Sequence, residues 1–395
     1  MRRVRWRRVA MNVVAAGAVA AIAVVAVHAF ARPPAAPRTA TAPKTVAAPA
    51  ATLPPALYSP TKLPPAWPGP LPYPILIADS HNSRILEVAP NKQIIWQYPD
   101  PTAKSSTAGI GSNVGVSGDD AFFSPHGNSI VTNDEDGGTI LRIDYYTHQV
   151  LWHYGIPGQL GSAPGELNYP DDAYMLPNGN FVVADIRNCR ELMISPAHQI
   201  LMQWGKAQTG YCQTNPAQGL FGYPNGDTPQ PNGDILMSFI SGNRLALLSP
   251  TGQVIWNVSS PDLYGGYVSD AQLLSDGNVL VCGYGKPGVV LIFNPQTGQV
   301  VWQYRVLSGP GELDHPSLAL PLPNGNILLN DDRNDRVIVI DPTTNQIVWQ
   351  YGTTGVAGTG YNQLNIPDGV DVDYWRNWRA WLPQHPQDVI AQPHA

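Results

Sequence analysis

Charged residues are scarce in this sequence. They make up 13% of the 395 residues, about half of the roughly 25% that soluble domains usually contain. Residues 1–78 contain nine Lys or Arg and no acid, so the rest of the chain holds 14 basic and 29 acidic residues and a formal net charge of −15. A body this acidic lacks the basic surface that a phosphate backbone requires, which excludes nucleic-acid binding.

Cysteine is also rare, with three residues and no Cys-x-x-Cys pair. No Cys or His spacing suits zinc. Cys189 and Cys212 lie in loop-like sequence 23 residues apart, so they could pair in an exported protein, whereas Cys282 lies in an apolar strand and is expected to be a buried thiol. The chain shows no Ser-His-Asp order, nucleophile elbow or phosphate loop.

The N-terminus joins a basic stretch to an apolar run. Residues 1–8 contain five Arg, and residues 9–31 are apolar apart from Asn12 and His28. About 20 apolar residues can span a membrane, and the arginines are expected to stay cytoplasmic, which places the remainder outside. Two interpretations stay open: a single-pass signal anchor in the plasma membrane, or a secreted protein whose signal peptide is cleaved after Ala31.

A Pro- and Ala-rich segment follows the apolar run. Residues 32–72 contain no acid and show no apolar periodicity. Such a stretch cannot bury enough surface to fold, and its prolines keep it extended. We expect a disordered linker between membrane and domain.

Beyond residue 72, three features recur in a fixed order. The first is a two-residue turn, usually Asn-Gly, within residues 124–128, 176–180, 230–234, 274–278 and 322–326. The second is a loop Asp-x-x-Asn-x-Arg, in residues 79–84, 185–190 and 331–336. The third is a Gln followed by two apolar residues and usually Trp, at intervals of 46–56 residues. Four short strands in about 50 residues are typical of a β-propeller blade.

The repeats predict an all-β fold of six four-stranded blades over residues 73–375. The first blade lacks one strand, and an unmatched strand remains near the C-terminus. Pairing of Val370–Asp373 with the strand around Ile75–Ala78 would close the ring and remove two exposed sheet edges. At the start of the tail, residues 376–395, the spacing of Trp378 and Trp381 with Trp375, which directly precedes the tail, predicts a short helix that packs on the propeller and ends before Pro383.

The segments between blades and the ends of blades resemble known families. YGIPGQLGSAPGELNYPDDA and YGTTGVAGTGYNQLNIPDGVDVD, with the Asp-x-x-Asn-x-Arg loops, resemble NHL-repeat propellers. NPQTGQVVWQY (294–304) and DPTTNQIVWQY (341–351) resemble the Trp-docking repeats of quinoprotein-like propellers. The resemblance covers about 300 residues and implies the six-bladed architecture, but these folds carry many functions.

Two conspicuous repeated features have a structural interpretation. One Trp per blade on the outermost strand is expected to pack between neighbouring sheets, with its N–H bonded to a backbone carbonyl. In the Asp-x-x-Asn-x-Arg loops, Asp and Asn are expected to bond nearby backbone, and Arg to tie neighbouring blades together.

The best candidate site lies at the start of each inner strand, where blades converge on the axis. Aligning the six starts predicts an oxygen-rich collar of Asp119, Asp171, Asn225, Ser269, Ser317 and Asp368. The rim above this collar is expected to contain Tyr169, Tyr223, Tyr267 and His315. Propellers often bind ligands at such a channel mouth, and Asp119, Asp171 and Asp368 could hold a Ca²⁺-type ion. The alternative is that these side chains only cap turns.

These features favour a non-catalytic, extracytoplasmic binding or scaffold module for a protein, a glycan or a small molecule. The alternative is an enzyme with an axial site. The resemblance leaves open two enzyme classes: a Ca²⁺-dependent hydrolase or lyase, and an arylsulfotransferase-like enzyme. The second class uses histidines at the axis, and His315 is the one histidine placed there, which makes it a weak catalytic candidate. Pyrroloquinoline quinone is not expected as a cofactor. The propeller dehydrogenases that use it usually have eight blades and a pair of adjacent cysteines, and this sequence predicts six blades and contains no adjacent cysteines.

Overall fold

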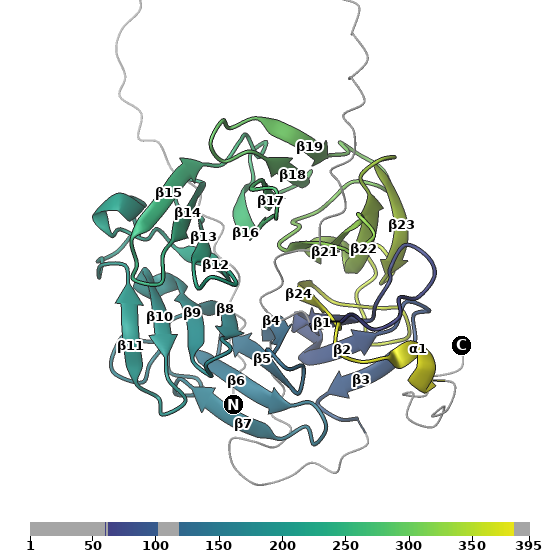
Figure 1. Ribbon diagram of the computed structural model, residues 1–395, viewed down its shortest axis with the longest axis horizontal. Helices are drawn as coiled ribbons and strands as arrows, with labels where there is room; N and C mark the ends of the chain where they lie inside the picture. The colour runs from purple at the N-terminus through teal and green to yellow at the C-terminus, as the bar shows by residue number, and fades with distance from the viewer. Residues whose placement is uncertain (1–59, 61, 102–117, 383–395) are drawn as a thin grey trace, which may run out of the picture. The chain divides into compact units, whose positions relative to one another are not determined.

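Alternating apolar strands and tight turns fold into six antiparallel sheets of four strands each, arranged around a central axis (Figure 1). The computed structural model describes residues 60, 62–101 and 118–382. The expected six-bladed all-β propeller is confirmed. The basic stretch 1–8, the apolar segment 9–31 and most of the 32–72 linker lie outside the described residues. Among the described residues, no helix is long and apolar enough to cross a membrane.

We number the blades along the chain and give their strands from the axis outward. Blade 1 contains β24 (Pro367–Val372), β1 (Ile75–Asp79), β2 (Arg84–Val88) and β3 (Ile94–Tyr98). Blade 2 contains β4 (Gly118–Phe123), β5 (Ser129–Asp134), β6 (Thr139–Asp144) and β7 (Val150–Tyr154). Blade 3 contains β8 (Pro170–Met175), β9 (Phe181–Asp185), β10 (Arg190–Ile194) and β11 (Ile200–Trp204).

The second half repeats this order. Blade 4 contains β12 (Pro224–Pro229), β13 (Ile235–Phe239), β14 (Arg244–Leu248) and β15 (Val254–Ser259). Blade 5 contains β16 (Tyr267–Leu273), β17 (Val279–Tyr284), β18 (Val289–Phe293) and β19 (Val300–Tyr304). Blade 6 contains β20 (Ala319–Pro321), β21 (Ile327–Asp331), β22 (Arg336–Asp341) and β23 (Gln346–Tyr351).

The C-terminal strand closes the ring. β24 pairs antiparallel with β1, with Val370 opposite Ile77, which confirms the predicted closure. Hydrogen bonds also link neighbouring inner strands: the Phe123 amide of β4 donates to the Asp371 carboxylate of β24 at 2.8 Å. Closure therefore leaves no free edge at the junction of the first and last blades.

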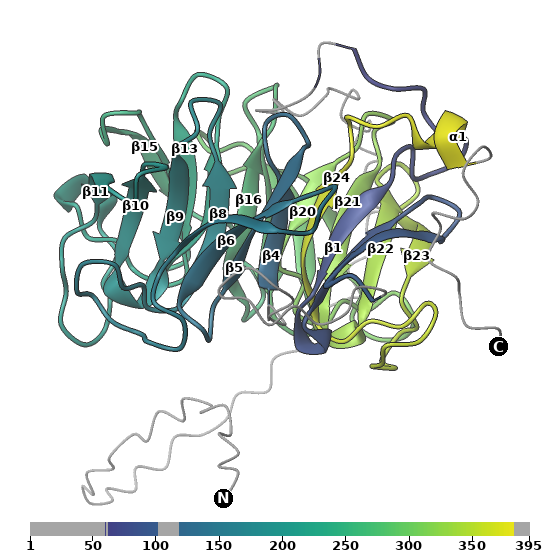
Figure 2. The same cartoon turned by 90° about the horizontal axis from the view of Figure 1, so that it is seen from below.

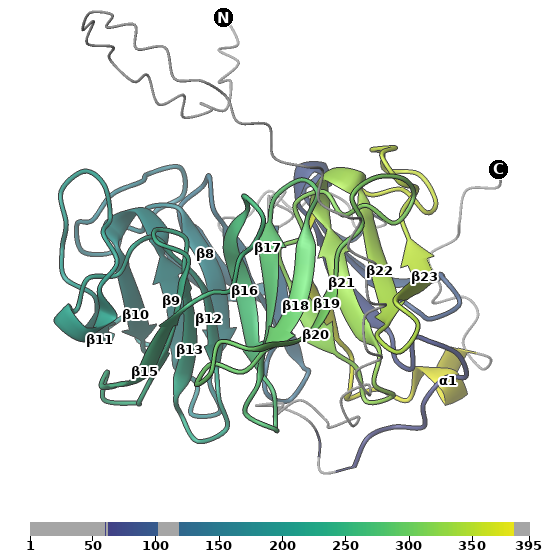
Figure 3. The ribbon, with the colours of Figure 1, turned by 90° about the horizontal axis from the view of Figure 1, so that it is seen from above.

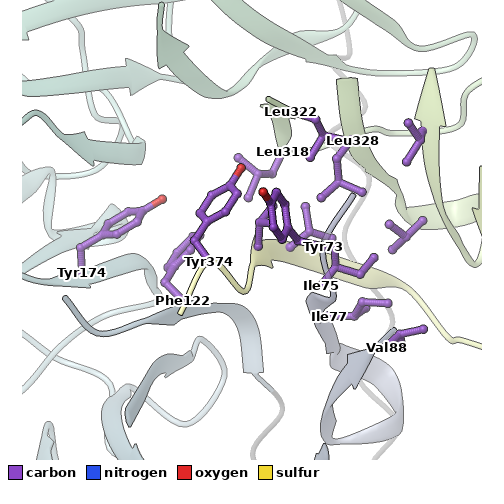
Figure 4. Packing of buried hydrophobic residues seen from close by; sticks show 14 of the residues in the cluster. Tyr73, Ile75, Ile77, Val88, Phe122, Tyr174, Leu318, Leu322, Leu328 and Tyr374 are labelled. Atoms are coloured by element: carbon purple, nitrogen blue, oxygen red, sulfur yellow. The ribbon is translucent and has the colours of Figure 1, made fainter. Parts of the chain in front are cut away.

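Most of the apolar core lies between neighbouring blades. One buried cluster joins blades 2 and 3 through Val131, Phe181 and Val183, and a larger one extends across the axis. In that larger cluster the Tyr73 and Tyr374 rings lie 5.2 Å apart, and Phe122 stacks on Tyr174 at 4.0 Å (Figure 4). Aromatic side chains from blades 2 and 3 and from the segments flanking blade 1 therefore meet near the axis.

Outer tryptophans of four blades bond to the next blade, as expected, whereas the indole nitrogen of Trp204 in blade 3 has no hydrogen-bond partner among the described residues. The indole N–H of Trp96 donates to the Tyr145 carbonyl at 2.7 Å, and that of Trp302 donates to the Pro342 carbonyl at 3.1 Å. Across the closure, Trp349 donates to the Pro90 carbonyl at 2.9 Å. In each case the acceptor lies in the next blade, so these tryptophans hold neighbouring blades together by hydrogen bonds.

The Asp-x-x-Asn-x-Arg loops form 3-10 turns, including η1 (Ser80–Asn82), η2 (Ile186–Asn188) and η4 (Asp332–Asn334). In the third loop, Arg336 Nε bonds Asp331 at 2.7 Å, while its other nitrogens donate to the Pro310 and Glu312 carbonyls of the segment between blades 5 and 6. Arg therefore ties a blade to the chain that leads into it, which confirms the structural interpretation of this loop.

The tail packs against the propeller through a helix shorter than expected. α1 (Trp378–Trp381) contains only two of the three tryptophans. Trp378 is buried and donates to the Asp373 carboxylate at 2.7 Å, whereas Trp375 precedes the helix and lies on Phe123. The side views place α1 on one face of the ring and η1, drawn in purple, on the other (Figures 2 and 3).

The expected linker boundary at residue 72 is too late. Leu71 is 1% exposed and belongs to the core. The Pro70 carbonyl accepts hydrogen bonds from Asn324 and Asn326, and the Pro64 carbonyl accepts one from Tyr73. The amino-acid composition does not predict this packing, because it depends on one leucine and on backbone carbonyls, which any proline-rich segment contains.

Candidate functional site at the central axis

A repeated irregularity shapes the start of the inner strands. In blade 2, Gly118 pairs with Asp134 and Ala121 pairs with Thr132, so Asp119 and Asp120 together oppose Asn133. The same shift separates Pro170 from Ala173 in blade 3, and related shifts occur in blades 1, 4 and 5. A β-bulge of this kind bends a strand and redirects its side chains, and here it redirects the predicted collar residues and their neighbours.

Side chains of the second strands stabilise several of these bulges. The Asp120 amide donates to Asn133 Oδ1 at 2.8 Å. In blade 6, where the pairing shows no register shift, the Leu318 amide just before β20 donates to Asn330 Oδ1 at the same distance. In blade 4 the Gly226 amide donates to the Ser238 hydroxyl at 2.8 Å. The bulged amides are thus satisfied without a ligand.

The predicted collar residues come together around the axis. Asn225 donates to the Asp171 carboxylate, and the Ser317 hydroxyl donates to the Asp368 carbonyl at 2.7 Å. The Ser80 hydroxyl contacts Asp119 at 3.4 Å. Ser269 is buried at the corresponding position of blade 5. These contacts, with those of Asp119 to Asp171 and Asp368, join collar residues of blades 1, 2, 3, 4 and 6.

Three carboxylates converge within this collar. One oxygen each from Asp119, Glu135 and Asp171 lies within 4.8 Å of the others, with Asp119 and Glu135 partly exposed and Asp171 buried. Burial, and then the charge of Asp119, raise the pKa of Asp171 well above its usual value. Asp368, the third predicted metal ligand, lies nearby, where burial raises its pKa although contacts with Asp119 and Asp332 lower it. A cation would relieve this repulsion.

The predicted rim residues take an unusual backbone conformation. Tyr169, Tyr223 and His315 have φ values of 56°, 53° and 60°. Arg187 lies over the Tyr169 ring at 3.9 Å, and Tyr223 makes an edge contact with Tyr211. Tyr267 and Tyr284 have ring centroids 5.1 Å apart. The rim is therefore aromatic on several blades.

His315 forms a charged cluster at the edge of blade 6. Its Nδ1 lies 2.5 Å from Asp314, which also accepts a hydrogen bond from Lys286 at 2.7 Å. Burial lowers the pKa of His315, although Asp314 partly opposes this shift. The ring contacts Tyr284 at a centroid distance of 4.8 Å. His315 therefore has the partner that a general base would need.

Two groups of acids at the axis were missed by the sequence analysis. Glu135 lies in the loop after β5, a degraded copy of the Asp-x-x-Asn-x-Arg loop. Asp120, Asp172 and Asp270 are the residues directly after the collar positions in blades 2, 3 and 5. In an unbulged strand these residues would point away from the collar, so alignment alone did not select them. Three Asp in one column of the alignment was the signal available.

The cysteines form the pair considered from the sequence. Cys189 and Cys212 are joined by a disulfide, with Cα atoms 5.7 Å apart, and Cys282 is a free, buried thiol. The bond connects the turn η2 of blade 3 to the segment that leads into blade 4.

A pocket of about 500 Å³ lies beside α1, away from the collar. It is lined mainly by aromatic side chains, among them Trp96, Tyr145 and Trp381, together with Arg376. Arg376 stacks 3.4 Å above the Tyr145 ring and pairs with Asp373 at 3.2 Å, so its charge is already compensated. The collar gathers more groups able to bind a charged ligand.

A family model of PQQ-like repeats matches part of the chain. Residues 227–365 match the family model described as outer membrane protein assembly factor BamB. The match covers most of blades 4–6 and agrees with the resemblance to Trp-docking repeats, whereas the NHL resemblance is not confirmed. No curated protein matches the chain.

A solved structure of low identity shows the same fold. A crystal structure of a protein of unknown function from Bacteroides caccae has a TM-score of 0.52 at 16% identity, covering 76% of this chain and 98% of that one. A streptogramin B lyase reaches 0.43 at 14% identity, covering 60% and 70%. Inactive virginiamycin B lyase from Staphylococcus aureus with quinupristin reaches 0.42 at 15%, covering 58% and 67%. These similarities carry no argument about activity.

Proposed function

We propose that the protein is an extracytoplasmic, non-catalytic binding module that takes a small, oxygen-rich ligand at the axial collar through a Ca²⁺-type ion. The observation that carries this proposal is the convergence of Asp119, Glu135 and Asp171 within 4.8 Å. Carboxylate oxygens are the ligands that Ca²⁺ prefers, and it accepts six to eight of them. Three carboxylates would leave coordination positions for a ligand.

The surroundings support a ligand with several hydroxyl groups, such as a glycan. Asp119 and Glu135 are partly exposed, so an ion between them is reachable from solvent. Tyr267 is 37% exposed and lies beside Tyr284. Aromatic faces next to a cation can pack on the apolar side of a sugar ring while its hydroxyls reach the ion.

The disulfide supports placement outside the cytoplasm. Bonds such as Cys189–Cys212 persist in oxidising compartments and are rare in the cytosol. The proposal therefore keeps residues 9–31 as the membrane anchor of a single-pass protein, with cleavage after Ala31 as the alternative.

The test measures the melting temperature of the purified full chain with Ca²⁺, with Mg²⁺ and with a chelator, with and without a panel of soluble glycans. We expect Ca²⁺ to be required for any glycan-induced rise, and Ca²⁺ itself to raise the melting temperature by about 5 °C at 100-fold excess over Kd. Glu135→Gln should abolish glycan binding, whereas Asp136→Asn, an exposed acid in the same loop, should not. Equal glycan binding in chelator would contradict the proposal.

One observation favours an enzyme instead. His315, which pairs with Asp314, contacts the Tyr284 ring. Burial raises the pKa of Tyr284, and the charges of Asp332 and Asp368 raise it further. A hydrolase or lyase could use His315 as a general base beside an axial ion. Turnover of ester, lactone or aryl sulfate substrates that His315→Ala removes, with Ca²⁺ binding retained, would favour this second candidate.

A further inference from the structure

A second group of carboxylates lies one residue further along the inner strands. Asp120 in β4, Asp172 in β8 and Asp270 in β16 each contribute an oxygen to a cluster in which these atoms lie within 4.8 Å of one another. These three residues are 5%, 0% and 2% exposed. Unlike the collar carboxylates, all three are enclosed by protein.

Apart from the other carboxyl groups of the cluster, each of these carboxylates keeps one oxygen without a hydrogen-bond partner in the described part of the chain. These atoms are Asp120 Oδ1, Asp172 Oδ1 and Asp270 Oδ1. The other oxygen of Asp172 accepts the Asp227 amide at 3.2 Å. A buried polar atom without a partner carries a substantial energetic cost, and three of them in one cluster indicate a missing common partner.

Three buried aspartates in the Asp-x-x-Asn-x-Arg loops have a cationic partner. Asp79, Asp185 and Asp331 pair with Arg84, Arg190 and Arg336, at 2.6 to 2.7 Å. Within the residues that the structure describes, no Lys or Arg forms an ion pair with Asp120, Asp172 or Asp270. Up to three negative charges at this cluster thus lack the compensation found in the loops.

Two glycines leave room for the unpartnered oxygens of Asp270 and Asp120, because glycine has no side chain. Gly226 and Gly369 occupy the equivalent positions of blades 4 and 1. A Cβ at Gly226 would clash with Asp270 Oδ1, and one at Gly369 would clash with Asp120 Oδ1. Glycine at both positions therefore keeps the carboxylates converged at the axis.

We propose that Asp120, Asp172 and Asp270 form a buried binding site for a Ca²⁺-type cation, separate from the collar. Two oxygens that bind one Ca²⁺ ion at about 2.3–2.6 Å lie at most about 4.6–5.2 Å apart, so separations within 4.8 Å allow the three carboxylates to reach a common ion. An ion here joins blades 2, 3 and 5 across the axis. It is a structural ion, because all three of its carboxylates are buried, unlike Asp119 and Glu135 of the collar. Further protein oxygens or enclosed water would complete its coordination.

The competing arrangement is three carboxyl groups that share protons. Burial and the neighbouring acids raise the pKa of all three residues, so protonation would also relieve the repulsion. The two arrangements differ in their response to chelators and to replacement by Asn, which resembles a protonated Asp but supplies no negative charge.

The experiment measures bound Ca²⁺ by mass spectrometry in the purified full chain after Ca²⁺ loading and dialysis, with the melting temperature before and after prolonged chelation. The variants are Asp172→Asn for the buried site and Glu135→Gln for the collar. Asp227→Asn is the matched control, because Asp227 is fully buried but lies outside the cluster, where Glu191 contributes to its raised pKa. Asp270→Asn serves as a second variant if Asp172→Asn does not fold.

We expect the wild type, Glu135→Gln and Asp227→Asn to retain a Ca²⁺ ion that Asp172→Asn and Asp270→Asn lack. Chelation should lower the wild-type melting temperature by about 5 °C or more. A wild type that holds no Ca²⁺ and does not respond to chelators would overturn the proposal in favour of shared protons. Loss of glycan binding in Glu135→Gln with the buried ion retained separates this inference from the collar proposal.

Discussion

Single buried aspartates in this protein exist in two settings. In the turns after β1, β9 and β21, an Arg five residues later neutralises the Asp and also bonds carbonyls of the segment between blades. At the axis, acids face one another instead. The first setting stabilises the fold by itself, whereas the second requires a proton or a cation.

Replacing Arg336 by Leu should destabilise the protein by about 3–5 kcal/mol, because Asp331 would remain as an unpaired buried charge. Both side chains are almost completely buried, at 2% and 0% exposure. The matched control is Arg244→Leu in blade 4, where the arginine bonds the neutral Asn257, and its cost should be about 1 kcal/mol. Urea unfolding measures both values, and equal losses would contradict the role of the charge.

The sequence predicted the collar residues but not the residues next to them. Polar side chains at the start of each repeat were enough to align Asp119, Asp171 and Asp368. Locating Asp120 and Asp172 requires knowledge that the strand bulges there, and a bulge depends on the register with the neighbouring strand. Glu135 was missed because it approaches the axis from a loop after β5.

At the scale of elements, closure was predictable because one strand was missing at one end of the chain and surplus at the other. The extent of α1 was not. The carboxylate of Asp373 accepts hydrogen bonds from the Trp375 and Arg376 amides at 2.9 and 3.2 Å. This turn fixes the chain before Asn377 caps the helix by accepting from the Ala380 amide. Trp375 therefore packs from a turn, despite its helical spacing.

Truncations test the closing strand. Removing residues 364–395 deletes β24 and exposes the edge of β1, so we expect loss of the β-sheet circular dichroism signal or aggregation. Removing residues 376–395 deletes α1 but leaves β24 paired, and the sheet signal should persist with a lower melting temperature because Trp378 and Leu382 are buried. A folded monomer after the longer deletion would show that closure is dispensable.

At the scale of the whole molecule, negative charge gathers toward the axis. The described acids near it include the collar carboxylates, the buried cluster and the facing pair Glu191 and Asp227. Burial raises the pKa of Glu191 to about 8, and burial raises that of Asp371 in the inner strand β24 to about 7. The propeller therefore depends on conditions that neutralise its interior acids.

This arrangement predicts how stability depends on pH. A carboxyl whose pKa is higher in the folded than in the unfolded state stabilises the fold below its unfolded pKa, and this contribution is lost as the pH rises through the folded value. The loss should extend from about pH 4.5 to about pH 8 for Glu191 and from about pH 3.8 to about pH 7 for Asp371. In chelator, we therefore expect the free energy of unfolding to fall by about 4–7 kcal/mol between pH 5 and 8.5.

Calcium should make the free energy of unfolding depend less steeply on pH, because an ion at Asp120, Asp172 and Asp270 favours their ionised forms. Acids with lowered pKa values, such as Asp144 and Asp341, are held ionised by hydrogen bonds from nearby Thr side chains and amides despite partial burial. They stay ionised above pH 5 and do not contribute to the slope in this window. Urea titrations at each pH, with Ca²⁺ and with chelator, measure both curves. Parallel curves would mean that the axial acids are neutralised by protons alone, whereas curves that diverge as the pH rises are what a buried cation requires.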